Sequence, residues 1–446
     1  MKEKSYTKEA LLDITKEKNI RYIRLMFSDL NGYLKNIEIP SKQLESALNN
    51  EIMFDGSSVT GFTQIEQSDL FLAPDPDSWF ILPNTDKEPH LDTACLICDI
   101  YQGKEPFIGD PRSNLQRLLS NLKAYGVTDF NFGAEPEFFL LEPRDQNHSV
   151  PYVKDNAGYF DLAPQDTASS CRRAIVEELE AIGFDIEANH HEAAPGQHEI
   201  SWRFDTALKT CDKIQIFKST VKRVAKDYNL NATFMPKPVF EIAGSGMHCN
   251  LSLFNGNKNL FDDSSKENGL SDLAEKFIAG LLAYVRSFTA ITNPTINSYK
   301  RLVPHHEAPA YVAWSQQNRS ALIRIPAQRG LATRIELRSA DPTTNPYLAM
   351  AVILAAGLKG IEDNLTVPKP VETNIFDLTD NEREDLKINA LPRSLSEAID
   401  LFKNEPTIQS ALGKHISSQF IHLKSKEVEE YHSHVTRWEF HRYLNN

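Results

Sequence analysis

Three segments of this chain place polar or charged side chains two residues apart. They are Glu135 and Glu137 in GAEPEFF, His248, Asn250 and Ser252 in MHCNLSL, and Arg334, Glu336 and Arg338 in TRIELRS. In an extended strand, residues two apart point to the same face. A fourth segment, QHEISW, carries Glu199 after a Pro195-Gly196 turn, seven residues beyond Glu192. We therefore expect several strands to present charged side chains on a face of the sheet.

Carboxylates that converge on one face repel one another, so they must be solvated, protonated or neutralised by cations. Carboxylate oxygens with one imidazole suit Mg²⁺ or Mn²⁺ better than a structural zinc ion, which prefers thiolates or more histidines. Each glutamate taken singly is also compatible with an ordinary half-exposed sheet surface. Taken as a set, these residues favour a divalent metal site.

Arginines form a second set near the same segments, with Arg301 in SYKRLVP and Arg319 and Arg324 in NRSALIRIP. A guanidinium binds a carboxylate or phosphate through two parallel hydrogen bonds. Beside a carboxylate metal site, such groups indicate phosphoryl transfer, although structural salt bridges to the glutamates are an equal alternative for any single arginine. Because the chain lacks a Walker-type loop and GSGMHC lacks the third glycine of a dinucleotide motif, any ATP is held outside those familiar loops.

The hydrophobic periodicity predicts a small β-rich domain followed by a larger α+β domain. Residues 21–30 and 33–39 alternate around an Asn31-Gly32 hairpin turn, and Ser41 is the predicted N-cap of the next helix. Residues 73–89 read as mostly loop, and the Pro/Gly-rich residues 103–112 mark the expected domain boundary. The longer predicted helices cover 114–125, 167–182, 207–228, 270–291, 346–361 and much of the last thirty residues.

Composition excludes several classes of protein. With 24% charged and 41% hydrophobic residues among 446, the chain reads as folded, and its net charge of −13 argues against a nucleic-acid partner. The sequence shows neither an apolar signal core nor a stretch long enough to cross a membrane. Five cysteines are too few for a disulfide framework, and Cys95 and Cys98 lie in the strand-like run ACLICDI. We therefore expect structural thiols and a cytoplasmic location, without membrane contact.

Several longer motifs occur together and in order along nearly the whole chain. They are FDGSSVTGF, GAEPEFF, HHEAAPGQHEI, MPKP, GSGMHCNLSLF, NSYKRLVP, NRSALIRIP and RIELRSADPTTNPYL. As a set they resemble the type I glutamine synthetase family, in its Gram-positive-like, non-adenylylated form. The resemblance implies an α+β fold: a small N-terminal β-grasp domain over residues 1–105, then a large catalytic α/β domain over 106–446. The catalytic domain would have a curved antiparallel sheet and a C-terminal helical strap.

The resemblance also implies a reaction and an assembly. The family ligates ammonia to L-glutamate with ATP through γ-glutamyl phosphate, giving L-glutamine, ADP and phosphate, with two or more Mg²⁺ or Mn²⁺ ions per active site. It forms dodecamers of two hexameric rings with active sites between subunits. One alternative is a γ-glutamyl-amine (polyamine) ligase on the same fold, and another is a non-catalytic glutamine sensor that binds a transcription regulator. Asp55 favours ammonium, because a carboxylate suits a small cation.

Residue roles follow from the same resemblance. Glu137, Glu192 and Glu199 resemble the ligands of one ion. Glu135, His248 and Glu336 resemble the ligands of the second. The residues implied in substrate binding are Gly244, His248, Arg301, Arg319 and Arg338, and those implied in ATP binding are Ser252, Arg319, Arg324 and Arg334. The implied catalytic residues are Asp55, which would deprotonate ammonium, Glu307, a flap carboxylate that closes over the intermediate, and Arg338, which would hold the transferring phosphoryl group.

The chain departs from the family pattern in four places. His305-His306 replaces the usual Gly-Tyr before the flap glutamate, and Gln64 replaces an arginine linked to glutamine inhibition. Ala243 replaces a common asparagine, and Phe376 stands where relatives regulated by adenylylation carry the modified tyrosine. Because phenylalanine has no hydroxyl group to modify, we predict that the chain is not adenylylated.

Overall fold

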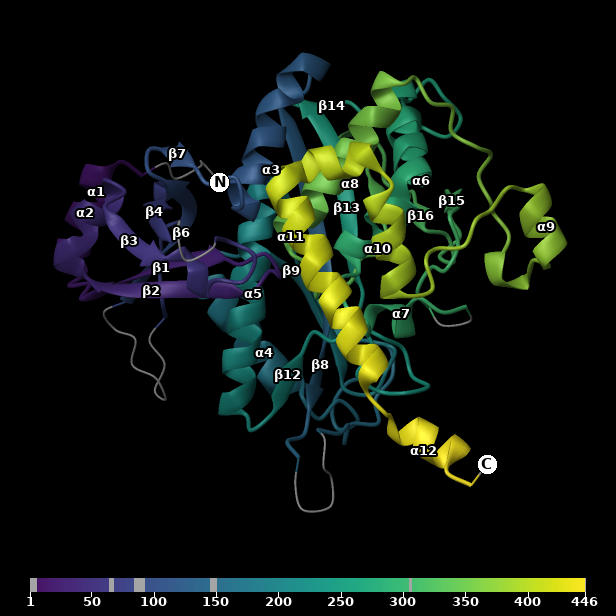
Figure 1. Cartoon of the computed structure of the whole chain (residues 1–446), viewed down its shortest axis with the longest axis horizontal. Coiled ribbons are helices and arrows are strands. Elements are labelled where there is room, and N and C mark those ends of the chain that lie inside the picture. Colours follow the sequence, from purple (N-terminus) through teal and green to yellow (C-terminus); the bar gives the residue numbers. More distant parts are fainter. Residues whose placement is uncertain (1–5, 64–67, 84–92, 145–150, 305–306, 446) are drawn as a thin grey trace.

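The computed structural model describes residues 6–63, 68–83, 93–144, 151–304 and 307–445. Two sheets lie side by side, each with its own helices (Figure 1). The N-terminal sheet stands at the left of Figure 1, and the larger sheet passes behind helices in the centre. The long C-terminal helix, in yellow, crosses the front of the larger part and leads to a short helix that projects from the body.

The N-terminal sheet has seven strands in the described residues. They are β1 (Tyr22–Ser28), β2 (Leu34–Pro40), β3 (Ile52–Asp55), β4 (Asp69–Pro74), β5 (Phe80–Ile81), β6 (Thr93–Gln102) and β7 (Glu105–Pro106). The main order is β2-β1-β6-β4-β3, with β1 and β6 parallel. β1 and β2 pair antiparallel, so the predicted hairpin is confirmed. Helices α1 (Lys8–Glu17) and α2 (Leu44–Leu48) cover its core, which includes Leu11, Ile23 and Leu44.

The prediction that Ser41 caps a helix is wrong. Ser41 is the first residue of a 3₁₀ turn, Ser41–Gln43, and α2 begins only at Leu44. The position before the turn is Pro40, which makes no side-chain capping bond. The 3₁₀ turn leads directly into α2, so the segment needs no cap at Ser41.

The larger sheet has ten strands in the described residues, with main order β15-β16-β17-β13-β8-β10-β9. They are β8 (Asp129–Leu141), β9 (Ile186–His191), β10 (Gln197–Trp202), β11 (Asp205–Thr206), β12 (Asn231–Thr233), β13 (Met247–Asn255), β14 (Lys258–Asn259), β15 (Trp314–Ser315), β16 (Ile323–Arg324) and β17 (Ile335–Leu337). All pairings are antiparallel except β15 with β16. The architecture is therefore α+β, as predicted.

The helices of the larger part are α3 (Pro111–Ser120), α4 (Ser169–Ala181), α5 (Ala207–Asp227), α6 (Asp272–Thr292), α7 (Ser298–Arg301), α8 (Pro346–Glu362), α9 (Asp380–Asp385), α10 (Leu395–Lys403), α11 (Pro406–Ser433) and α12 (Arg437–Tyr443). The longer predicted helices are present near their predicted ranges, together with three shorter helices (α7, α9 and α10) that were not predicted. The terminal helix differs from its prediction: it begins earlier and bends at Gly413, where φ is 75° and ψ is 164°. α12 then follows as a separate helix, with Thr436 and Glu439 forming a capping box.

The apolar core lies on one side of the large sheet. Met247, Cys249, Leu251 and Leu253 of β13 are completely buried, as period-two alternation requires. α6 and α8 pack so closely within this core that a Cβ atom at Gly280 would lie 2.2 Å from the carbonyl oxygen of Ala356. The opposite face of β13 is left to its polar residues.

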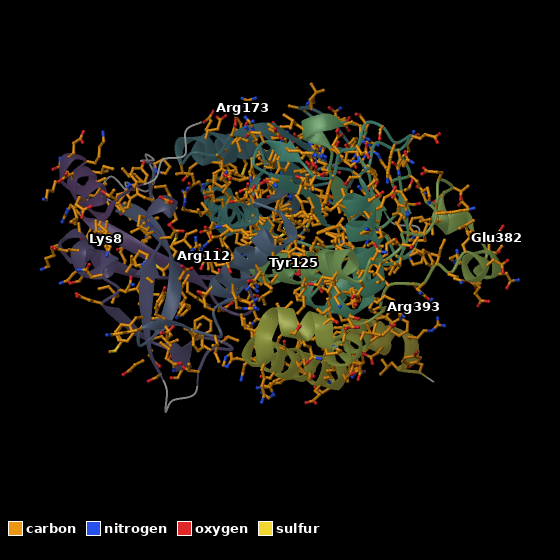
Figure 2. All side chains as sticks on the ribbon, turned by 90° about the horizontal axis from the view of Figure 1, so that it is seen from above. Lys8, Arg112, Tyr125, Arg173, Glu382 and Arg393 are labelled. Carbon is orange, nitrogen blue, oxygen red and sulfur yellow. The ribbon has the colours of Figure 1, made fainter. Side chains whose placement is uncertain are left out.

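A buried arginine joins the two parts of the molecule. Arg112 of α3 contacts Asp75 and Asp99 of the N-terminal part, both at 2.6 Å, and Asp212 of α5 at 2.9 Å. The Tyr347 hydroxyl also donates to Asp212, at 2.7 Å. Figure 2 shows Arg112 where the N-terminal part meets the rest. These contacts fix the two sheets relative to each other.

The five cysteines are free and buried, so the prediction of structural thiols is confirmed. Burial raises the pKa of the Cys95 thiol to about 12, which keeps it protonated and unreactive. None of the helices that the structure describes combines the length and apolar character needed to span a bilayer.

Candidate active site

The register of four neighbouring strands aligns the predicted polar residues. His248 of β13 lies directly opposite Glu135 of β8, and Asn250 lies opposite Glu336 of β17. On the other side of β8, Glu137 lies opposite Glu199 of β10. Side chains of directly opposed residues point to the same face of a sheet. The polar residues predicted from alternation therefore line one continuous face.

One group of possible cation ligands contains Glu135, His248 and Glu336, whose ligand atoms lie within 4.8 Å of one another. His248 Nδ1 is 3.4 Å from Glu135 Oε2 and 3.5 Å from Glu336 Oε1. Glu336 is 1% exposed, so its charge is almost completely removed from solvent. The structure thus brings together the three residues expected to hold one ion.

A second group contains His190, Glu192 and Glu199. His190 Nε2 lies 2.8 Å from Glu192 Oε1. Glu137, which was expected to join Glu192 and Glu199, lies between the two groups: its Oε1 is 3.9 Å from His248 Nε2. Its other oxygen accepts hydrogen bonds from Gln197 Nε2 and the Gly246 amide, both at 2.8 Å.

Arginines surround the first group. Arg324 and Arg338 donate to the two oxygens of Glu336, Arg338 at 2.6 Å. Arg334 donates to Asn250 at 3.0 Å, and the Asn250 amide donates to Glu135 at 2.9 Å. Guanidinium groups are thus already aimed at the carboxylate face, where they could also contact an anionic substrate.

Arg301 lies next to Gly244 and Gly246 of the GSG segment that precedes β13. The residue is 4% exposed, and its guanidinium donates to the main-chain oxygens of Ser339, at 2.8 Å, and Arg338, at 3.2 Å. A Cβ atom at Gly246 would lie 2.5 Å from Arg301, and one at Gly244 would lie 2.1 Å from the Pro236 oxygen. The backbone contact makes glycine necessary at position 244, whereas a side chain at position 246 would displace the Arg301 guanidinium.

The electrostatics of the face differ between the two groups. Burial and then the charges of Glu137, Glu135 and Glu192 raise the pKa of Glu199 to about 10. Burial also raises the pKa of Glu137. For Glu135 and Glu336, burial is outweighed by His248, so the pKa of each carboxyl lies below its usual value; Arg338 and Arg324 add to this effect at Glu336. The Glu199 side is therefore short of positive charge.

The other predicted residues lie elsewhere or at the rim. Asp55 is exposed in the N-terminal sheet, where Ser57 and Ser58 donate to its carboxylate and hold its pKa below the usual value. Arg319 and Glu307 are exposed, whereas Ser252 of β13 is buried. Gln64 and His305-His306 lie outside the described residues.

A third cluster consists of three buried residues, Asp155, His191 and His198. His198 Nδ1 faces the Arg172 guanidinium at 2.9 Å, and Arg172 also pairs with Asp166 at 2.8 Å. A guanidinium can only donate, so His198 accepts this bond and carries its proton on Nε2. Arg172 thus already supplies the positive charge, and this cluster is an internal ion network rather than a cation site.

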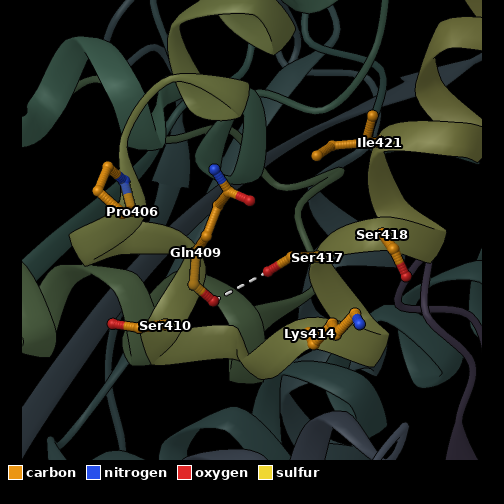
Figure 3. Close-up of a pocket in the computed structure, with 7 residues that line it drawn as sticks. All are labelled: Pro406, Gln409, Ser410, Lys414, Ser417, Ser418 and Ile421. Atoms are coloured by element: carbon orange, nitrogen blue, oxygen red, sulfur yellow. Dashed lines mark hydrogen bonds between the residues drawn. The ribbon is translucent and has the colours of Figure 1, made fainter.

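A measurable hollow lies away from this face. It has a volume of about 360 Å³ and follows the bend of α11, where the Ser417 hydroxyl bonds to the main-chain oxygen of Gln409 (Figure 3). None of the predicted site residues lines it.

Sequence reasoning missed two residues next to the predicted ligands: His190, which lies close to Glu192 and Glu199, and Gln197, which donates to Glu137. It placed Asn250 on the right face but did not predict that Asn250 links Glu135 to Arg334. His190 and Gln197 lie in HHEAAPGQHEI, on either side of the same turn. That hairpin could have identified them, because residues flanking a tight turn meet across it.

A sheet face that gathers glutamates and an imidazole beside arginines is typical of metal-dependent enzymes that handle phosphate groups. Family models agree: the glutamine synthetase catalytic domain matches residues 108–443, and the glutamine synthetase beta-grasp domain matches residues 19–103. The glutamine synthetases of Staphylococcus aureus strain Mu50 and Staphylococcus epidermidis strain RP62A are each 51% identical over 445 residues, covering 100% of this chain and 99% of the relative. The chain belongs to the glutamine synthetase family.

Solved structures give the same result. A GmaS complex with ADP superimposes with a TM-score of 0.88 at 30% identity, covering 98% of this chain and 99% of the other. The glutamine synthetase of Plasmodium falciparum, solved by cryo-electron microscopy, has a TM-score of 0.87 at 25% identity, covering 99% and 100%. The predicted family and the α+β fold with an N-terminal β-grasp domain are thus confirmed.

Proposed function

We propose that this glutamate–ammonia ligase carries out its reaction on the carboxylate face of the large sheet. The observation that carries the proposal is the register that places Glu135, His248 and Glu336 together and Glu137 opposite Glu199. The reaction is the ATP-dependent ligation of ammonia to L-glutamate through γ-glutamyl phosphate. The 51% identity to staphylococcal glutamine synthetase over the full chain supports this activity.

The donor set fits divalent cations. Enzymes of this family use ATP and divalent metals, and hard oxygen donors with one imidazole suit Mg²⁺ or Mn²⁺. Glu135, His248 and Glu336 would hold one ion, and Glu192 and Glu199, with Glu137 or His190, would hold the other. Bound there, the ions neutralise the phosphate oxygens of ATP and make its γ-phosphorus easier to attack. The raised pKa of Glu199 supports this assignment, because it reflects burial of the carboxyl together with the charges of neighbouring carboxylates.

The first chemical step forms the acyl phosphate. A γ-carboxylate oxygen of glutamate attacks the γ-phosphorus of ATP, and the bond to the β-phosphate oxygen breaks to release ADP. Arg338 and Arg301 hold the glutamate and the transferring group, while Arg319, Arg324 and Arg334, with Ser252, hold ATP. The buried position of Arg301 beside Gly244 and Gly246 supports its place in the glutamate pocket.

The second step forms the amide. Asp55, reaching the site from a neighbouring subunit, accepts a proton from ammonium, and the ammonia attacks the acyl carbon, so the C–O bond to phosphate breaks. The lowered pKa of Asp55 suits an ionised carboxylate that attracts ammonium. Glu307 closes over the intermediate and excludes water, which would otherwise hydrolyse the acyl phosphate.

We further propose a cytoplasmic homo-oligomer, a dodecamer of two hexameric rings with active sites between subunits. Within each subunit, the proposed β-grasp domain covers residues 1–105 and the catalytic domain covers residues 106–446. The exposed side chains of Val435, Trp438, Phe440 and Tyr443 on and before α12 support a strap that is covered by another subunit. The net charge of −13 supports the expectation of no nucleic-acid partner. We include a transcription regulator among the proposed partners.

An isotope experiment tests the intermediate. Glutamate labelled with ¹⁸O in its γ-carboxylate is incubated with ATP, ammonium and Mg²⁺. One labelled oxygen is expected in the phosphate released per glutamine formed, because the acyl phosphate bond breaks at carbon. Glutamine formation with unlabelled phosphate would contradict this mechanism.

A further inference from the structure

His191 connects two segments that meet at the second group of ligands. Its ring Nδ1 lies 2.7 Å from the main-chain oxygen of Glu192, the next residue. Its Nε2 lies 3.1 Å from Asp155 Oδ2, in the loop of residues 155–160. Its own main-chain oxygen accepts a hydrogen bond from the Phe160 amide at 3.1 Å. A single buried residue thus ties both ends of the loop to the segment that carries Glu192.

The loop is held in an unfavourable conformation. Phe160 has a φ of 64°, although it is neither glycine nor asparagine. Its side chain is 61% exposed, so burial of the ring does not compensate for the strain. A bulky residue in this region of φ costs free energy and persists only where the surrounding contacts impose it. The bond from Phe160 to His191, together with the Asp155 contact, supplies such contacts.

The loop in turn surrounds His190, a member of the second ligand group. The Phe160 ring packs edge-on against His190 with centroids 4.9 Å apart, and the Tyr159 ring does so at 5.6 Å. His190 contacts the Glu192 carboxylate at 2.8 Å. The side chain of Glu192 is therefore oriented from one side by His190 and its main chain from the other by His191.

We propose that His191 is a positioning residue, which with Asp155 holds Glu192 and the 155–160 loop in the geometry that binds the second cation. The inference rests on the proposed role of Glu192 as a metal ligand. Partners that orient ligands from outside the metal site contribute strongly to metal affinity. The cluster itself is not the cation site, because the Arg172 guanidinium already donates to His198 Nδ1.

The test measures Mn²⁺ binding to the purified full-length oligomer without substrates, and electron paramagnetic resonance detects the bound and free ion. Asp155→Ser keeps an oxygen for the Ala157 amide, which Asp155 Oδ1 now accepts at 2.6 Å, but is too short to reach His191. We expect Mn²⁺ affinity to fall about 10- to 100-fold at one class of site and to stay unchanged at the other. Asp155→Asn, which can still bond to His191, should restore affinity to within about threefold of the original.

Asp161→Ser is the matched control. Asp161 lies in the same part of the chain and accepts a hydrogen bond from the Gly158 amide at 2.8 Å, but it is exposed. It should leave both classes of Mn²⁺ site unchanged. Should Asp155→Ser fail to assemble, His191→Asn replaces it with the same expected loss.

Two results would overturn the proposal. One is unchanged Mn²⁺ affinity in Asp155→Ser while Glu192→Gln loses one class of site. The other is an additional class of Mn²⁺ site that disappears with His191, which would make the cluster a cation site. Unchanged binding in Glu192→Gln is a separate result, because it would refute the proposed function of Glu192 itself.

Discussion

Glu137 on β8 and Glu199 on β10 occupy directly opposed positions of an antiparallel pair, with both carboxylates largely buried. Like charges in this arrangement destabilise a sheet unless something neutralises them. The Glu137 side is partly compensated by Gln197 and the Gly246 amide, whereas the pKa of Glu199 is raised to about 10. The pair is therefore the point where the protein gives up stability to build a site for cations.

This pair predicts a pH dependence of stability without metal. The folded-state pKa of Glu199 lies far above its unfolded value, so the folded protein binds more protons and loses stability as pH rises from about 4.5 toward 10. Glu199→Gln removes this loss. In EDTA at pH 9, thermal denaturation should show the variant with a midpoint higher by roughly 2 °C.

The same variant should gain less stability from Mn²⁺ than the original chain does. A ligand that binds only the folded state stabilises it, so Mn²⁺ should raise the denaturation midpoint of the original chain more than that of Glu199→Gln. A variant that is less stable than the original in EDTA at pH 9 would show that Glu199 is ionised and compensated without metal.

Glu336 predicts a loss of activity without a loss of assembly. Glu336→Gln removes the charge that faces His248, Arg324 and Arg338, so phosphate release from ATP should fall at least about 100-fold. Size-exclusion chromatography should show the original oligomer. The matched control is Glu362→Gln on α8, whose carboxylate pairs with Lys359 near the surface. Full activity of Glu336→Gln would refute its role as a ligand.

Arg112 predicts a large effect on stability. Arg112→Gln leaves Asp75, Asp99 and Asp212 without their shared cation, and breaking a buried ion pair costs about 3–5 kcal/mol. Denaturation by urea should show this decrease in the free energy of unfolding. Arg24→Gln, which removes a half-exposed contact to Glu38, should cost about 0–1 kcal/mol. Equal effects of the two substitutions would contradict the account of Arg112 as the joint between the two parts.

Phe376 predicts the absence of one modification. It lies in a short 3₁₀ turn, Ile375–Asp377, with its ring 6.2 Å from that of Tyr311. Incubation of the purified chain with an adenylyltransferase and labelled ATP should transfer no nucleotide, whereas a relative that carries tyrosine at this position serves as the positive control. Stable label on this chain would contradict the prediction.

Local patterns predicted the strands of the site well. Period-two alternation placed His248 and Asn250 on the face opposite Met247 and Cys249, and the structure shows the same division. The failure at Ser41 was also local, since a cap residue was assigned where a 3₁₀ turn precedes the helix. Such patterns report on one strand or one helix at a time.

Contacts between distant segments could not be predicted in this way. Arg112 and Asp212 are 100 residues apart, and no periodicity relates them. Asp155 and His191 are separated by 36 residues and meet only because the loop folds back over β9. The exact partner of Glu137 also depends on the register of three strands. The family resemblance named the ligands, but the contacts that orient them required the structure.

The most direct test of the central claim is the choice of nitrogen substrate. Phosphate release from ATP is measured with glutamate and Mg²⁺, in parallel with ammonium and with a panel of amines that includes polyamines. The account predicts glutamine formation with ammonium, and much slower turnover with the amines. Turnover with amines but not with ammonium would contradict it and would make the chain a γ-glutamyl-amine ligase.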